Sequence, residues 1–145
     1  RVIDTSKNIE RSLPDSSILR LTSAAFILSQ LENFVESIIR EHKVCEGKFS
    51  DILVSLTEAV NNAIIHGNQY DENKKVMVKC KTSTRGIQFS IVDEGKGFNP
   101  KNIPDPTSDE KIETCGGRGV FLMHQLSHRV IFSDQGRTVE IQFEI

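Results

Sequence analysis

Apolar residues in the first half of the chain recur every three or four positions, which is the period of a helix with one buried face. The first such segment runs from residue 21 to about residue 42, and the second runs from residue 50 to residue 67. A short strand is expected ahead of them at 9–13, and the polar residues 14–17 suit the turn and N-cap of the first helix. This part of the chain therefore predicts two amphipathic helices that share one core.

The second half of the chain changes to an alternation of apolar and polar residues, which is the period of a half-buried strand. Residues 76–80 and 87–91 form one predicted hairpin, a short helix is expected at 120–126, and residues 130–132 and 139–145 form a second hairpin. Helices before and between hairpins are typical of an α+β fold. We therefore expect a two-layer α/β sandwich, whose mixed but mostly antiparallel sheet is covered by helices on one face.

The composition is that of an ordinary soluble domain, and 145 residues suffice for one core, so residues 1–145 are assigned to a single domain. The 18 Lys and Arg residues nearly balance 20 Asp and Glu residues, which argues against nucleic acid or an anionic membrane as a partner. No apolar segment approaches the roughly 20 residues needed to cross a bilayer, and no signal-peptide pattern is present, so a cytoplasmic location is expected. Because the chain starts at Arg1, the sequence leaves open whether it is a fragment of a larger multidomain protein.

The cysteines offer no candidate site. Cys45, Cys80 and Cys115 are widely spaced, odd in number and form no C-x-x-C pair. This pattern indicates reduced thiols in a cytosolic protein, and neither disulfides nor zinc ligands.

The run from Glu58 to Gly67, E-A-V-N-N-A-I-I-H-G, places a carboxylate and a carboxamide four residues apart on the second predicted helix. Side chains at i and i+4 lie one above the other on a helix, so Glu58 and Asn62 project the same way. Two interpretations are open: a solvated polar stripe, or a site that holds a general base beside a metal ligand. Two glycine-rich segments later in the chain favour the second interpretation.

The first of these segments is D-E-G-K-G-F, which begins at Asp93 and carries Gly95 and Gly97, and the second is G-G-R-G at 116–119. In one interpretation each segment is simply a tight turn or a hinge, because glycine adopts positive φ without strain. Alternatively, glycines let a flat ring approach the backbone while Asp93 accepts a hydrogen bond from an exocyclic amine. A glycine-rich loop ahead of a helix also offers free N–H groups to phosphate. The proline-bearing segment 99–118 is then expected to be a mobile lid.

In order and spacing, the E-A-x-x-N-A-x-x-H-G, D-x-G-x-G-F and glycine-rich segments resemble those of the GHKL ATPase superfamily, and within it the bacterial anti-sigma factor serine/threonine kinases. The resemblance covers about residues 9–143. It implies the Bergerat fold, with ATP and Mg²⁺ as cofactors. Mg²⁺ keeps several waters and takes few protein oxygens, so one carboxamide together with the nucleotide phosphates makes a sufficient site.

The same resemblance implies a role for each candidate residue. Asn62 would bind the Mg²⁺ that bridges the nucleotide phosphates, and Glu58 would be the general base that orders the attacking hydroxyl. Asp93 would accept a hydrogen bond from the adenine amino group, with Gly95 and Gly97 as the floor of the pocket. Contacts to the phosphates would come from three residues of the glycine-rich box: Gly117, Arg118 and Gly119.

One feature departs from the family pattern, and one residue that matches the pattern receives no role in catalysis. Members often have Thr directly after the glycine of the last hairpin, whereas here Arg137 follows Gly136 and Thr138 comes next. A supporting role for a Thr hydroxyl is therefore left open. His66 matches the helix-end His of the motif, but a residue at a helix C-terminus has dipole and capping reasons to be there, and we do not assign it to catalysis.

The function implied by the resemblance is that of an ATP-dependent protein serine/threonine kinase that also acts as an anti-sigma factor. Such a protein sequesters a sigma factor and phosphorylates an anti-sigma factor antagonist, a STAS-type protein, and its relatives are commonly homodimers. Two alternatives stay open: a non-catalytic ATP- or ADP-binding interaction module, and the catalytic domain of a histidine kinase. Against the latter, the chain has no long dimerisation hairpin with a phosphoacceptor His. The sequence discloses neither the particular sigma factor and antagonist nor whether kinase activity is retained.

Overall fold

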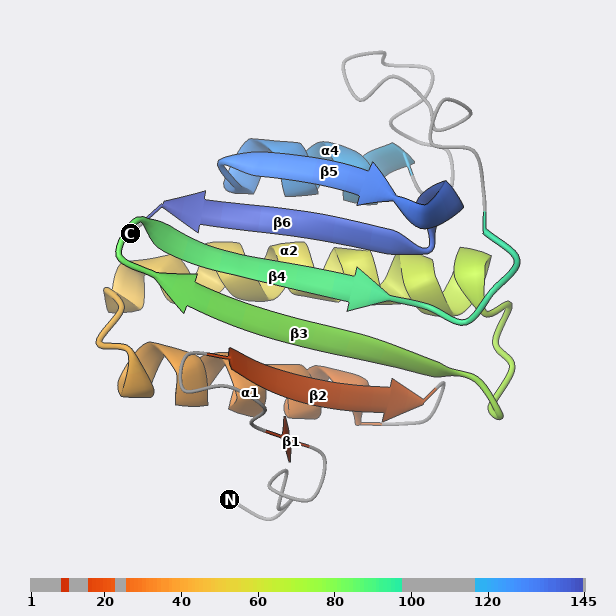
Figure 1. Ribbon diagram of the computed structural model, residues 1–145, viewed down its shortest axis with the longest axis horizontal. Coiled ribbons are helices and arrows are strands. Elements are labelled where there is room, and N and C mark those ends of the chain that lie inside the picture. The colour runs from red at the N-terminus through yellow and green to blue at the C-terminus, as the bar shows by residue number, and fades with distance from the viewer. Residues whose placement is uncertain (1–8, 11–15, 23–25, 98–116, 145) are drawn as a thin grey trace.

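The structure of the chain is a computed structural model that describes residues 9–10, 16–22, 26–97 and 117–144. Within these ranges the chain folds into two layers, a twisted sheet and a layer of helices that lies behind it (Figure 1). This arrangement confirms the predicted α+β sandwich.

Among the described residues, six strands form one sheet in the order β1-β2-β3-β4-β6-β5. The strands are β1 (Ile9–Glu10), β2 (Ser16–Thr22), β3 (Lys75–Ser83), β4 (Gly86–Val92), β5 (Arg129–Ser133) and β6 (Thr138–Glu144). Every pairing between them is antiparallel, so the described strands contain no parallel pair of the kind that a mixed sheet implies. The register aligns Leu19, Val78, Ile91 and Val139 in one row, and all four side chains are buried. The sheet therefore turns a continuous apolar surface toward the helices.

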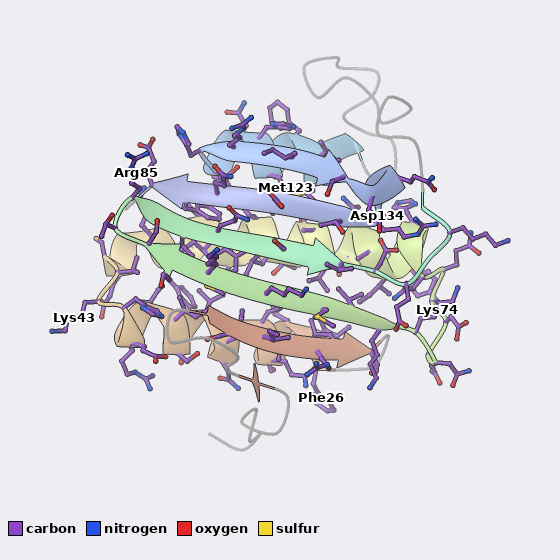
Figure 2. The ribbon with its side chains drawn as sticks, in the orientation of Figure 1. Phe26, Lys43, Lys74, Arg85, Met123 and Asp134 are labelled. Carbon is purple, nitrogen blue, oxygen red and sulfur yellow. The ribbon has the colours of Figure 1, made fainter. Side chains whose placement is uncertain are left out.

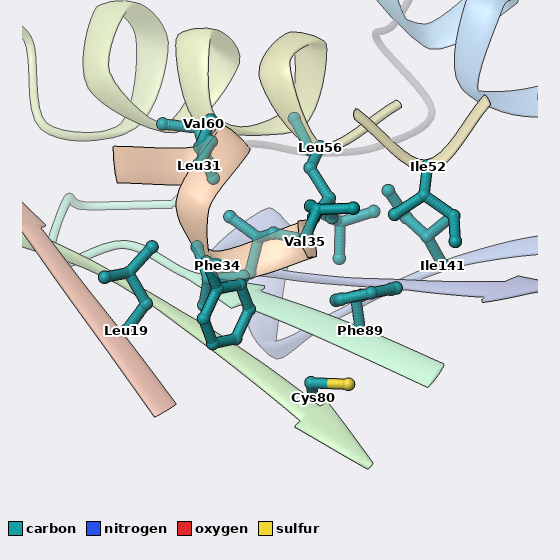
Figure 3. Packing of buried hydrophobic residues seen from close by; sticks show 14 of the residues in the cluster. Leu19, Leu31, Phe34, Val35, Ile52, Leu56, Val60, Cys80, Phe89 and Ile141 are labelled. Atoms are coloured by element: carbon teal, nitrogen blue, oxygen red, sulfur yellow. The ribbon is translucent and has the colours of Figure 1, made fainter. Parts of the chain in front are cut away.

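Three α-helices of the described chain cover this surface: α1 (Ile27–Glu41), α2 (Phe49–Asn62) and α4 (Gly117–Leu126). Apolar side chains of the helices and strands meet in one core, in which Phe34 of α1, Leu56 of α2 and Phe89 of β4 are fully buried (Figure 3). Phe89 packs edge-on against Phe143, with 6.0 Å between the ring centroids, which is a favoured geometry for aromatic pairs.

The prediction of a helix from residue 21 is wrong, because this residue lies in β2 and α1 begins only after that strand. Leu19 and Leu21 are both buried, and Arg20 between them is more exposed, which is the alternation of a strand. The seven-residue spacing between Leu21 and Leu28 is compatible with one face of a helix, yet Leu28 is 52% exposed and so does not share the burial of Leu21. Burial against β3 therefore decides the conformation of this segment.

The remaining boundaries differ less from the predictions. Residues 16–17 belong to β2 and do not cap a helix. Of the strand predicted at 9–13, the first two residues form β1, and residues 11–13 lie outside the described ranges. The second predicted helix, the short helix near the C-terminus and both hairpins are confirmed. The lid predicted at 99–118 lies outside the described residues as far as residue 116, and α4 begins directly after it.

The described helices and cysteines bear on two further expectations. No helix in the described ranges is long and apolar enough to cross a bilayer. Cys45 is exposed, Cys80 is buried and both are free thiols, whereas Cys115 lies outside the described residues. Burial raises the pKa of the Cys80 thiol to about 12, so this side chain packs as a small apolar group.

Candidate functional site

The candidate residues gather at one end of the sheet, where β4 ends and β6 begins. Figure 2 shows Lys74 and Asp134 at this end, and Lys43 and Arg85 at the opposite end. Four parts of the chain contribute: the end of α2, the loop after β4, the first turn of α4 and the turn before β6. The fold thus brings together segments that are far apart in the sequence.

Helix α2 separates its apolar residues from the candidate polar pair. Leu56 and Val60 are fully buried in the core, whereas Glu58 and Asn62 are half-buried and lie beside α4. A Cβ placed on Gly119 would lie 2.9 Å from Glu58 Oε2 and 3.4 Å from Asn62 Nδ2. The missing side chain at Gly119 therefore lets the first turn of α4 lie against both polar groups.

Helix α2 ends in a π-helical turn, Ala63–Gly67, that reaches the end of β4. The N–H of Asn68 donates to the carbonyl of Ala63 at 2.7 Å, which is the i to i+5 bond of a π-turn. Gly67 lies against the carboxylate of Asp93, and a Cβ on Gly67 would overlap Asp93 Cγ. Glycine is therefore required here for the helix end and the carboxylate to touch.

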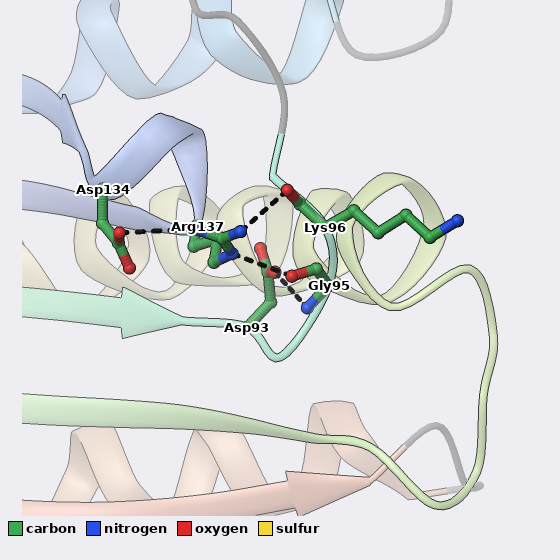
Figure 4. Close-up of polar contacts among 5 residues, drawn as sticks. All are labelled: Asp93, Gly95, Lys96, Asp134 and Arg137. Carbon is green, nitrogen blue, oxygen red and sulfur yellow. Dashed lines mark hydrogen bonds and ion pairs between the residues drawn. The ribbon is translucent and has the colours of Figure 1, made fainter.

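Asp93 follows β4 and is the buried acid of the site, with 5% of its surface exposed. Its Oδ1 accepts a hydrogen bond from the Gly95 N–H at 2.8 Å (Figure 4), and its own N–H donates to the carbonyl of Arg137 at 2.9 Å. Burial raises the pKa of the Asp93 carboxyl, while the Gly95 hydrogen bond and the positive charge of Arg137 oppose that shift. The carboxylate is thus fixed in direction and largely shielded from solvent.

The two glycines of the D-x-G-x-G segment lie where side chains do not fit. A Cβ on Gly95 would overlap the carbonyl of Gly67. Gly97 has a φ of 87°, and a Cβ on it would lie 2.7 Å from the carbonyl oxygen of Gln135. The loop after β4 therefore passes in close contact between the end of α2 and the turn before β6.

A small cavity connects the polar residues of α2 with those that follow β4. Its lining includes Asn62 from α2, Ala63 from the π-turn, Asp93 directly after β4, Met123 from α4 and Arg137 directly before β6. The carboxamide predicted to bind metal and the carboxylate predicted to bind adenine thus face one cavity. Glu58 is not among the lining residues of this cavity, and lies one turn away along α2, beside the first turn of α4.

Arg137 is a residue of the site to which the sequence assigned no role. Its Nε donates to the carbonyl of Gly95 at 2.8 Å and its Nη2 to the carbonyl of Lys96 at 2.9 Å (Figure 4). Its Nη1 lies 3.3 Å from Asp134 Oδ1. Thr138, the next residue, pairs with Val92 in the ladder between β4 and β6. The only sequence signal was the presence of Arg directly after the glycine of the last hairpin.

Asn68 is a second residue of the site to which the sequence assigned no role. It is 1% exposed, its Oδ1 accepts from the N–H of Glu94 at 2.8 Å and its Nδ2 donates to the carbonyl of Lys75 at 3.1 Å. The Glu94 side chain in turn accepts from the N–H of Lys75 at 2.5 Å. One buried amide therefore ties the end of α2 to β3 and to the loop that carries the glycines.

The other candidates are placed as follows. Gly117 and Arg118 form the backbone of the first turn of α4, and His66 lies exposed at the end of α2. In the described ranges, no group of three or more His, Cys, Asp or Glu residues is arranged to hold a metal ion. Mg²⁺ does not require such a group when phosphates and water supply its remaining ligands.

Comparison with known proteins assigns the chain to a family. Residues 22–143 match the family model described as histidine kinase-like ATPase domain. An anti-sigma F factor of Clostridium perfringens (strain 13 / Type A) is 32% identical over 125 residues, which cover 84% of this chain and 81% of the relative. An anti-sigma F factor of Clostridium kluyveri (strain NBRC 12016) is 31% identical over 120 residues, with 78% and 74% covered.

A more distant match lies among sensor proteins. The phosphate regulon sensor protein PhoR of Haemophilus influenzae is 26% identical over 102 residues, which cover 66% of this chain but only 23% of the relative.

Because the family model matches residues 22–143, the chain belongs to the family of histidine kinase-like, or GHKL-type, ATPase domains. Within that family it is similar to the bacterial anti-sigma F factors over most of its length, as the three sequence motifs predicted.

Proposed function

We propose that this protein is an ATP-dependent protein serine/threonine kinase of the anti-sigma factor type, which binds a sigma factor and phosphorylates a STAS-type antagonist. The observation that carries the proposal is the position of Glu58, a half-buried carboxylate one helical turn from Asn62, whose carboxamide faces the same cavity as Asp93. The similarity to anti-sigma F factors supports the same conclusion.

The groups at the Asp93 end of the cavity suit the amino edge of an adenine ring. A buried carboxylate accepts a hydrogen bond from the 6-amino group of adenine, whereas the 6-oxygen of guanine would face it unfavourably. Met123 and Ile91 line the same cavity and offer apolar surface to the ring. Asp93 is held in place by the Gly95 N–H, so its position does not depend on the ligand.

The Asn62 end suits phosphates and Mg²⁺. A carboxamide oxygen is a hard ligand of the kind that Mg²⁺ takes, and one such ligand suffices beside phosphates and water. Asn62 also lies beside the first turn of α4, where the N–H groups of a helix have no partners within the helix and can bind phosphate. These N–H groups belong to the glycine-rich box: Gly117, Arg118 and Gly119. Bound Mg²⁺ would neutralise negative charge on the phosphates.

Glu58 is then the general base. Phosphoryl transfer asks a protein mainly for positioning and charge neutralisation, with one base to take the proton of the attacking hydroxyl. Glu58 is half-buried, so a serine or threonine side chain of a protein substrate can approach it from the surface. Asn62, one turn further along α2, holds the phosphate end of the nucleotide near that hydroxyl.

A second candidate function is a nucleotide-dependent interaction module that transfers no phosphate. One observation favours it: Glu58 Oε2 lies against Gly119, only 2.9 Å from where a Cβ would be, so the start of α4 covers one side of the carboxylate. If α4 keeps this position when nucleotide is bound, a substrate hydroxyl does not reach Glu58.

The proposed partners follow from the family. A sigma factor and its antagonist are inferred because relatives that span most of this chain carry the name anti-sigma F factor. A homodimer is proposed from the family resemblance alone, and sedimentation of the purified protein measures it directly. A monomer at all concentrations would remove the dimer from the proposal and leave the kinase intact.

One experiment separates the two candidate functions. Wild type, Glu58→Gln and Asn62→Ala are incubated with Mg-ATP and a purified STAS-type antagonist from the same genome, and phosphoserine or phosphothreonine is located by mass spectrometry. We expect labelling by wild type, a roughly 10²–10⁴-fold slower rate for Glu58→Gln with ATP binding retained, and loss of Mg-dependent binding for Asn62→Ala. Tight ATP binding without any labelling would favour the interaction module.

A further inference from the structure

Each of the three nitrogens of the Arg137 guanidinium has a partner within the protein. Nε and Nη2 donate to the carbonyls of Gly95 and Lys96, and Nη1 pairs with Asp134 (Figure 4). Two of these three partners belong to the loop that follows Asp93. A guanidinium presents its donors in a planar fork of fixed geometry, so it restrains the direction of both carbonyls at once.

The main chain of Arg137 holds the same loop from its other end. The carbonyl of Arg137 accepts the N–H of Asp93 at 2.9 Å. The backbone and side chain of one residue thus bind the N–H of Asp93 and the carbonyls of Gly95 and Lys96. Residue 137 also lines the cavity beside Asp93. The position of the base-recognising carboxylate is therefore coupled to this residue.

The turn that delivers Arg137 is held in an unfavourable conformation. Asp134 and Gln135 have φ angles of 49° and 56°, in the left-handed region that residues with a Cβ avoid. Such strain persists where the surrounding structure imposes it, and it gathers at functional sites. Here the strained turn places the Asp134 carboxylate beside the Arg137 guanidinium, with which it forms an ion pair. It also places the Gln135 carbonyl against Gly97.

Charges around Asp93 act in both directions. Burial favours the protonated form, as does the negative charge of Asp134, whereas Arg137 and, more weakly, Lys74 favour the carboxylate. Asp134 is itself paired with Arg137, so removal of the guanidinium would leave Asp93 facing an uncompensated negative charge. Arg137 therefore opposes both causes that would protonate Asp93.

We propose that Arg137 is a positioning residue for base recognition: it clamps the backbone of Gly95 and Lys96 and keeps the Asp93 carboxylate aimed into the cavity, where it accepts a hydrogen bond from the amino group of an adenine. The inference rests on the proposed nucleotide-binding function and identifies the residue that shapes its base pocket.

The test compares three variants in ADP titrations between pH 5 and pH 8. Arg137→Met removes both fork and charge, Arg137→Lys keeps the charge without the fork, and Arg85→Met is the control, because Arg85 is an exposed arginine at the opposite end of the sheet. At pH 7.5 we expect ADP affinity to fall about 10- to 100-fold in Arg137→Met, about tenfold in Arg137→Lys and not at all in Arg85→Met.

The pH profile separates positioning from mere stability. In Arg137→Met the loss of affinity toward acid pH should begin at a higher pH than in wild type, whereas Arg137→Lys should keep the wild-type onset. Hydrogen exchange of the amides in the loop after Asp93 should be faster in both Arg137 variants, with the fold retained. A lower melting temperature with unchanged ADP affinity and unchanged pH onset would overturn the inference and leave the proposed function standing. A folded wild type that binds no adenine nucleotide would overturn both.

Discussion

The two ends of the cavity are held in different ways. Around Asp93, a buried carboxylate, the Arg137 fork, the Asn68 bridge and closely packed glycines fix the backbone through contacts that need no ligand. Around Glu58 and Asn62 the side chains are half-buried, and their close neighbour is the first turn of α4. The end proposed for base recognition is therefore held by contacts within the protein, whereas the groups proposed for transfer are half-buried and lie beside α4. Substitutions at the two ends should have different consequences.

The largest effect is expected at the transfer end. Glu58→Gln should lower phosphoryl transfer by roughly 10²–10⁴-fold, because the base is lost, and should change the free energy of unfolding by less than about 0.5 kcal/mol. Transfer kinetics and urea denaturation measure the two quantities. Glu72→Gln, at an exposed acid in the loop after α2, is the control and should change neither. A large loss of stability in Glu58→Gln would remove the contrast between the two ends.

At the base end the next largest effect is steric. Gly67→Ala and Gly95→Ala should each lower the free energy of unfolding by about 1–3 kcal/mol, because the new methyl group overlaps the Asp93 carboxyl or the Gly67 carbonyl. Both should also weaken ADP binding. Gly47→Ala is the matched control, because its Cβ would meet Cys45 Sγ at an ordinary 3.6 Å. Equal stability of all three variants in urea would show that the base end is not tightly packed.

The Asn68 bridge should contribute stability of a similar or smaller size. Asn68→Ala leaves the N–H of Glu94 and the carbonyl of Lys75 without their amide partner, which should cost about 1–3 kcal/mol. Asn61→Ala removes an exposed amide from α2 and should cost much less. Thermal and urea unfolding of the pair give the difference. If Asn61→Ala were the more destabilising variant, the bridge would not be what holds the loop.

Asp93→Asn should change stability less than the two Gly→Ala variants at the base end and Asn68→Ala do, and the size of its effect depends on pH. Because folding raises the pKa of the Asp93 carboxyl above its ordinary value of 3.8, the native state binds this proton more tightly than the unfolded chain does. Wild type should therefore lose stability relative to Asp93→Asn as pH rises from about 3.8 through the raised pKa, with a constant difference above it. Parallel urea titrations across this range measure the difference. A difference that shrinks as pH rises would contradict the direction of the shift.

Sequence periodicity predicted those parts of the site that depend on local spacing. Glu58 and Asn62 were expected on one side of a helix because i and i+4 positions are neighbours, and that spacing places both beside α4. Leu21 was misassigned because a few apolar residues suit either period, and burial against β3 decides between strand and helix.

Long-range contacts explain what the sequence could not predict. Arg137 binds Gly95 across 42 residues, and Asn68 binds Glu94 across 26. Both contacts depend on which strands are neighbours in the sheet and on the turn that precedes β6. Composition and spacing carry no information about either.

We propose that both ends of the cavity belong to one nucleotide site, with the base at Asp93 and the Mg²⁺-bound phosphates at Asn62. Calorimetric titration of wild type, Asp93→Asn and Asn62→Ala with Mg-ATP, and with ADP in the absence of Mg²⁺, tests it directly. We predict that Asp93→Asn weakens both ligands by a similar factor of about ten or more, whereas Asn62→Ala weakens Mg-ATP far more than Mg-free ADP. Equal losses for both ligands in both variants, or a wild type that binds neither, would contradict the account.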